Sequence, residues 1–155
     1  MSLIRSGQLG DAKAALDRQL LAQPGNGAAH LNRAYVLKEL GLAAEAERTL
    51  RVLAQRRPKD PVVLNNLGAL YLRVGRLPEA EAVLRKAVDL DPKGFEARAN
   101  LAGVLERRRD WAGALKIFEG LLSGAEPGER VAQIRERVRR LRSLAVASLT
   151  PKEKL

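Results

Sequence analysis

The sequence has no cysteine, one histidine (His30) and only 3% aromatic residues among 155. Without cysteine the chain cannot form disulfides, thiolate metal sites or a cysteine nucleophile. With a single histidine, the chain cannot form a metal site or a catalytic mechanism that requires two histidines. No uncharged run approaches the ~20 apolar residues that span a bilayer, and the first residues lack the pattern of a secretory signal. We therefore expect no membrane span in this chain.

The chemistry that remains is limited. No glycine-rich phosphate loop of either common spacing occurs, and His30 has no second histidine or cysteine with which to form a catalytic dyad. The carboxylates Glu45, Glu47, Glu79 and Glu81 fall early in expected helices, where an acidic side chain favourably faces the helix N-terminus and solvent. We expect a non-catalytic protein with no cofactor, no metal site and no small-molecule substrate.

A period of 34 residues organises the chain. Five columns keep this interval: Pro24, Pro58 and Pro92; Ala12, Ala46, Ala80 and Ala114; Leu16, Leu50, Leu84 and Phe118; Gly7, Gly41 and Gly75; Asn32, Asn66 and Asn100. Periods of 20 to 50 residues are typical of stacked repeat architectures. Glycine suits a tight turn with a left-handed backbone, proline ends a helix, and alanine lets two helices approach closely. Each unit is therefore predicted to be helix, short turn, helix, longer turn.

The second unit carries a family resemblance. Its segment Leu64–Tyr71, followed by Ala80, Leu84 and Pro92, resembles a tetratricopeptide repeat, with leucine where that pattern has Trp and Phe. The third unit has Arg109 where the turn glycine is expected. The resemblance implies an all-α, right-handed superhelix of antiparallel helix pairs, with units at 27–60, 61–94 and 95–128.

Half a unit, 7–26, precedes these three. Leu9 to Leu21 is predicted to be a second helix, with Gly7 as the turn before it and the first helix of that unit missing. We interpret the chain as a fragment of a longer bacterial protein, whose exposed apolar stripe seeks a second copy. The alternative is a natural N-terminus with one capping helix.

Residues 129–149 are predicted to form a capping helix, followed by a tail at 150–155. Apolar residues recur every three or four positions and so form one face of this helix. The other face is polar, and solenoids need a terminal element with a polar outer face. Arginines are expected on that outer face: Arg130, Arg135, Arg137, Arg139, Arg140 and Arg142. The end of the helix is apolar, so Leu144 and Val146 are expected either to contact something outside this chain or to fold back on the third unit.

The family resemblance implies that the first helices of the units line a concave groove, which we expect to bind an extended peptide or a partner helix. The candidate contacts are Asn32, Tyr35, Lys38, Asn65, Asn66, Arg73, Asn100 and Arg107. The column Asn32, Asn66, Asn100 resembles the asparagine ladder of some tetratricopeptide superhelices. The carboxylate clamp of chaperone-binding members is not expected, because only Asn66 agrees with it and Glu96 has the wrong charge.

The formal net charge is +10, and residues 129–155 hold eight basic and three acidic residues. We interpret the basic helix, with Arg135, Arg139 and Arg142, first as a solvated face, second as a site for an acidic protein partner, and third as a nucleic-acid site, which lacks aromatic residues for base stacking. Self-association through the N-terminal edge or Leu144–Leu149, giving a homodimer, is the alternative function. A cytoplasmic location is expected, or a periplasmic one if the full-length protein is anchored.

Overall fold

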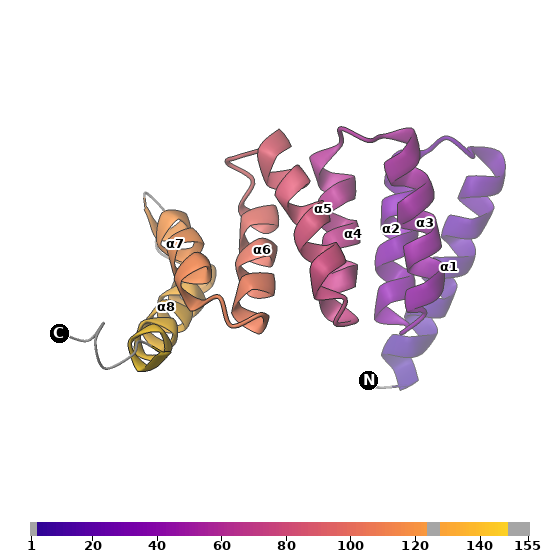
Figure 1. Ribbon diagram of the computed structural model, residues 1–155. Helices are drawn as coiled ribbons and strands as arrows, with labels where there is room; N and C mark the ends of the chain where they lie inside the picture. The colour runs from indigo at the N-terminus through magenta and orange to yellow at the C-terminus, as the bar shows by residue number, and fades with distance from the viewer. Residues whose placement is uncertain (1–2, 124–127, 149–155) are drawn as a thin grey trace.

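The computed structural model describes residues 3–123 and 128–148, and these form helices joined by short turns (Figure 1). Leu149 and the predicted tail at 150–155 lie outside the described residues. The helices, in chain order, are α1 (Leu3–Ala22), α2 (Gly27–Glu39), α3 (Ala43–Arg56), α4 (Pro61–Arg73), α5 (Leu77–Leu90), α6 (Phe95–Arg107), α7 (Trp111–Leu122) and α8 (Glu129–Ser148). The all-α architecture predicted from the sequence is confirmed.

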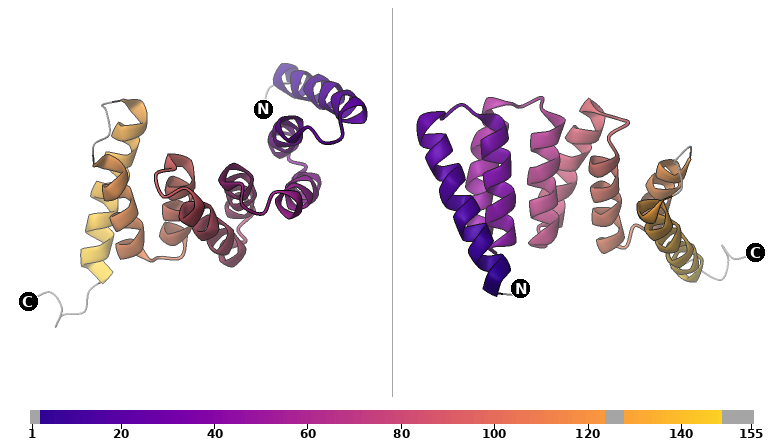
Figure 2. Two further views of the ribbon diagram at one scale, coloured as in Figure 1. Left: turned by 90° about the horizontal axis from the view of Figure 1, so that it is seen from above. Right: turned by 180° about the vertical axis from the view of Figure 1, so that it is seen from behind.

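Three antiparallel pairs, α2 with α3, α4 with α5 and α6 with α7, stack side by side into a curved superhelix (Figure 2). Two of the first helices, α2 and α4, begin at a capping side chain, whereas α6 begins after Gly94 without one. The Asn26 side chain accepts from the Ala29 N–H, and the Asp60 side chain accepts from the Val62 and Val63 N–H groups. Each satisfies amides that have no partner within the helix. The caps therefore set where α2 and α4 begin.

The periodic small and large residues form the contact inside each pair. Ala46, Ala80 and Ala114 are fully buried, and so are Leu84 and Phe118, with Leu50 3% exposed. These residues belong to one continuous cluster that runs from α2 to α8. The period in the sequence thus corresponds to the same packing contact repeated along the solenoid.

The short turn inside each pair has the same geometry in all three units. Gly41 and Gly75 have φ angles of 79° and 83°, and Arg109 takes the left-handed conformation as well, with a φ of 64°. The following N–H in each turn donates to the carbonyl five residues earlier, as from Leu42 to Leu37, which closes the helix end. Arg109 therefore adopts the backbone of the glycine that it replaces.

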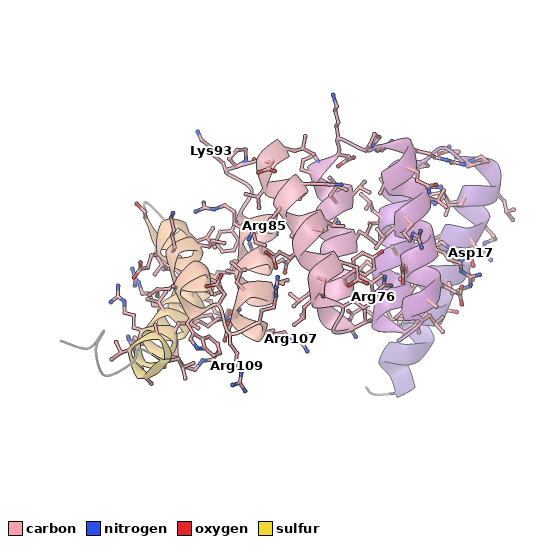
Figure 3. The ribbon with its side chains drawn as sticks, in the orientation of Figure 1. Asp17, Arg76, Arg85, Lys93, Arg107 and Arg109 are labelled. Carbon is pink, nitrogen blue, oxygen red and sulfur yellow. The ribbon has the colours of Figure 1, made fainter. Side chains whose placement is uncertain are left out.

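Replacing Arg109 with Gly should raise the free energy of unfolding by about 1 kcal/mol, because a side chain in the left-handed region costs roughly that much. Arg109 is exposed at the end of α6 (Figure 3), so little packing is lost. Urea denaturation followed by circular dichroism measures the change. Arg109→Ala is the control, since it removes the side chain without removing the Cβ; equal stabilisation by both variants would contradict the explanation.

The prediction of a turn at Gly7 is wrong. Gly7 lies inside α1, which runs unbroken from Leu3 to Ala22. At Gly41 and Gly75 the turn is stabilised by the second helix folding back onto the first, and the described residues before Gly7 hold no helix onto which α1 could fold. The local helical hydrogen bonds therefore continue through the glycine, which costs only about 1 kcal/mol relative to alanine.

The outward face of α1 differs from the inner second helices. Leu16 is half-buried by α2, while Gln19, in the column of the buried Leu53, Ala87 and Leu121, is exposed. Exposed Ala15 lies beside it on this face. The open side of α1 is therefore small and polar, and the apolar stripe expected there is partly covered.

Helix α8 occupies the position of a fourth first helix, since it begins 34 residues after Phe95. Val131, Ile134, Val138 and Leu141 are buried against the third unit. The positions that hold Leu64, Leu67, Gly68 and Tyr71 in α4 are occupied in α8 by exposed residues, namely Ala132, Arg135, Glu136 and Arg139. A following helix would find no apolar face here, so α8 caps the described solenoid. Leu144 and Val146 near its end are 37% and 59% exposed.

Candidate functional site

The first helices α2, α4 and α6 lie next to one another on the concave side, with α8 beyond α6 (Figure 2). On α2, Asn32 and Tyr35 are exposed, and the Lys38 ammonium lies 4.8 Å from the centroid of the Tyr35 ring. This cation–π contact holds the ring at the surface. The ring thus offers an apolar platform to a ligand.

The asparagine column is only partly free for a ligand. The Asn66 side-chain N–H donates to the Val62 carbonyl at 2.8 Å, and that of Asn100 donates to the Asn65 side-chain oxygen at 2.9 Å. Asn32 is exposed, whereas Asn65, Asn66 and Asn100 are half-buried. An amide oxygen accepts from two directions and its nitrogen donates twice, so each of these side chains keeps hydrogen-bonding capacity.

Two hollows open beside this column. One, of about 370 Å³, lies between α4 and α6 and is lined by Val62, Asn65, Asn66 and Glu96 among others. The second, of about 270 Å³, lies between α6 and α8, where Asn100 meets Phe95 and Ile134. The asparagines therefore stand at the edges of small depressions that can receive side chains.

The predicted groove arginines link neighbouring units. Arg73 Nη1 lies 3.1 Å from a carboxylate oxygen of Glu39, one period earlier. Arg107, labelled in Figure 3, donates to the Leu72 carbonyl at the end of α4. The Arg73 side chain is still 51% exposed, so an anionic ligand can reach it, but both arginines also hold units together.

The arginines of α8 are exposed, Arg137 in part, as expected for an outer face, but most of them also pair with carboxylates. Arg130 pairs with Glu96 at 3.1 Å, Arg137 and Arg140 pair with Glu106, and Arg142 pairs with Glu119 at 2.7 Å. The reason is that α6 and α7 present carboxylates along the seam with α8. Arg139 pairs within α8 with Glu136, and only Arg135 of this set has no ion-pair partner within residues 3–123 and 128–148.

A second set of polar contacts joins the units on the other side of the solenoid, and the sequence reasoning missed it. Arg76 donates to Glu47 at 2.9 Å and lies over the Tyr71 ring, whose hydroxyl donates to the same carboxylate (Figure 3). Burial, followed by the charge of Glu47, raises the pKa of Tyr71. Burial acts to raise the pKa of Glu81, but hydrogen bonds from Arg85 and Arg108 hold it below its usual value. Pairs separated by 27 or 29 residues carry no local signal in the sequence.

The described residues offer no evident catalytic arrangement. His30 is half-buried with its Nε2 2.9 Å from the Pro24 carbonyl, as expected for a packing residue. Nowhere in the described ranges do three histidine, aspartate or glutamate side chains gather as metal ligands would. Among the same residues no helix combines the length and apolarity needed to cross a bilayer.

Comparison with known proteins gives a consistent result. Two family models, both described as tetratricopeptide repeat, match residues 3–71 and 65–129. Together they extend over all three predicted units and α1. Among solved structures, a tetratricopeptide repeat protein from Parabacteroides merdae superposes with a TM-score of 0.77 at 23% identity, covering 90% of this chain and 55% of the other.

Further relatives share part of the chain. The first tetratricopeptide domain of Spaghetti (RPAP3), solved with an HSP90 peptide, has a TM-score of 0.70 at 20% identity over 79% of this chain and 94% of that one. The human protein O-mannosyl-transferase TMTC2 is 37% identical over 68 residues, 44% of this chain, and Hsp70-Hsp90 organizing protein 2 of Arabidopsis thaliana is 24% identical over 70% of it. The chain spans 8% and 19% of the lengths of these two relatives.

Proposed function

Because the chain belongs to the tetratricopeptide repeat family, we propose that its concave face binds an extended peptide segment of a partner protein. The observation that carries the proposal is the row of Asn32, Asn66 and Asn100, one on each first helix of the superhelix. An extended peptide presents an N–H and a carbonyl on successive residues, and an amide side chain complements both. The row therefore favours backbone recognition, with little selection of ligand side chains.

Neighbouring groups add to this contact. The exposed Tyr35 ring supplies an apolar surface next to Asn32, and the hollows beside Asn66 and Asn100 accept ligand side chains. The exposed Arg73 attracts acidic residues of the ligand. The ligand best suited to the groove is an extended, mildly acidic segment with small or apolar side chains.

The groove differs from a site for a C-terminal carboxylate. The clamp positions of this chain include Leu31, Tyr35 and Glu96, and Glu96 is exposed beside Arg130 at 3.1 Å. A carboxylate at that position repels a ligand carboxylate. We therefore propose recognition of an internal peptide segment, although one solved neighbour is described as bound to an HSP90 peptide.

Replacing Asn66 with Ala should weaken a captured peptide about tenfold, because a typical hydrogen bond contributes roughly 1 kcal/mol and an unpaired ligand amide adds to the loss. The peptide is first selected from a displayed random library on the whole chain, and its affinity is then measured by fluorescence anisotropy. Asn32→Ala should give a similar loss, since Asn32 is the exposed member of the row.

Gln55→Ala is the matched control, because Gln55 is an exposed amide on α3, a second helix. It should leave the affinity unchanged. Selected peptides whose affinity does not respond to Asn32→Ala or Asn66→Ala would exclude the asparagine row as the binding site.

A further inference from the structure

An apolar groove lies on the opposite side of the solenoid from the asparagine row, where α1 and α3 flank α2. It encloses about 550 Å³. In Figure 2, seen from above, α1 and α3 stand on either side of α2 at the outer edge of the curve. The lining residues are Asp17, Leu20, Leu21, His30, Arg33, Arg48, Thr49, Val52, Leu53 and Arg56.

The groove contains apolar side chains that are exposed to solvent. Leu21 is 83% exposed and Val52 is 46% exposed, and they lie in the same groove as Leu20 and the buried Leu53. Single exposed leucines are ordinary in proteins, but several around one depression mark an interaction site. The lining is therefore suited to apolar side chains of a partner.

The charges around the groove are unbalanced. Asp17 is already neutralised, since hydrogen bonds from Arg33 and Lys13 lower its pKa (Figure 3). Arg48 and Arg56 are exposed, and neither has an ion-pair partner in the part of the chain that the structure describes. Two unpaired cations thus border the apolar surface, which favours carboxylates on whatever binds there.

The corresponding place one unit along the solenoid lacks these features. One period after Leu21 and Val52 stand Gln55 and Lys86, and one period after Arg48 and Arg56 stand Ala82 and Leu90. Stacking alone therefore does not require the combination of an apolar lining and a basic rim. It occurs between α1 and α3 and is not repeated between α3 and α5.

We propose that this groove docks an amphipathic helix of a partner protein, with apolar side chains three and four residues apart and glutamates or aspartates beside them. A helix suits an open groove between two helices, where it lays its apolar face on the lining while its carboxylates reach Arg48 and Arg56. This second surface is independent of the concave peptide site, so one protein can hold two partners.

The test uses a displayed library of helix-forming peptides, randomised on one face and selected on the whole chain. We expect enrichment of clones with leucine-like residues three and four apart and acidic residues beside them. Both Leu21→Asp and Arg48→Glu should weaken an enriched peptide at least tenfold, as measured by fluorescence anisotropy. Both residues are exposed, and circular dichroism checks that the fold is kept.

Two controls separate this site from others. Leu90→Asp removes an exposed leucine that stands one period after Arg56 and outside the groove, and it should change nothing. Asn66→Ala, which should weaken a peptide in the concave site, should also leave the helical peptide bound. In the reverse design, Arg48→Glu should regain affinity for a peptide whose acidic residues are exchanged for lysine.

Three results would overturn the proposal. One is the absence of any enriched clone that responds to Leu21→Asp. Another is binding of a simple amphiphile in the groove. It would be seen if dodecanoate, and not the peptide, displaces a fluorescent anionic probe. The last is a second copy as the occupant, seen in light scattering as a dimer that Leu21→Asp converts to monomer.

Discussion

Replacing Phe118 with Ala should lower the free energy of unfolding by about 3–5 kcal/mol. Phe118 is fully buried, belongs to the continuous core cluster, and has the Arg137 guanidinium 4.7 Å from its ring centroid. Its removal leaves a cavity where α7 meets α6 and α8. Because natural domains are stable by only about 5–15 kcal/mol, urea denaturation should show a large fall in the midpoint.

The chain supplies its own control for this change. The same column holds Leu50 and Leu84 in the other units, so Phe118→Leu puts the residue of the neighbouring repeats into the third one. It should cost less than half as much as Phe118→Ala, since most of the volume is kept. Equal losses for Leu and Ala would show that the ring itself, and its contact with Arg137, carries the stability.

Replacing Gly68 with Ala should destabilise the protein by about 2 kcal/mol, although alanine is the better helix former by about 1 kcal/mol. A Cβ at this position would lie 2.4 Å from Cγ and 2.7 Å from Cδ2 of Leu84. Both helices of the pair must then move apart, or Leu84 must leave its buried position. Thermal or urea unfolding measures the loss.

Gly103→Ala is the matched control, since Gly103 also lies inside a first helix. Its Cβ would meet Leu72 at 3.5 Å, an ordinary contact, so the change should stabilise by up to about 1 kcal/mol. The two substitutions are chemically identical and should have opposite signs. Stabilisation by Gly68→Ala would mean that α4 and α5 have room for a methyl group.

Much of the fold could be predicted from the sequence because the same residue types recur at the positions that make the same contact in each unit. The columns of Ala46 and Leu50 predicted the helix pairs, and Arg109 was correctly placed at the glycine position of its turn. The helix α8 and its buried face also followed, since its apolar residues recur every three or four positions. Each of these features depends on local spacing, which a sequence displays directly.

Other features could not be predicted in this way. Gly7 was expected in a turn because it shares a column with Gly41, but a turn also requires a helix against which the chain folds back. The ion pairs of the α8 arginines were not predicted, because their partners Glu96, Glu106 and Glu119 lie 23 to 34 residues away in the sequence. Long charged side chains pair with groups that lie close in the folded structure, and sequence separation does not show which groups those are.

The sequence alone determined the scarcity of chemistry, with one histidine and no cysteine, and the 34-residue unit that makes this a stacked helical protein. The tertiary structure decided which of the basic residues are free. Most arginines of α8 are held by carboxylates of α6 and α7, while Arg48 and Arg56 have no ion-pair partner among the described residues and lie beside an apolar groove that the 34-residue period does not predict. The physical reason is that a repeat fixes the backbone path, whereas charge pairing and surface hollows depend on side chains from different units that meet only after stacking.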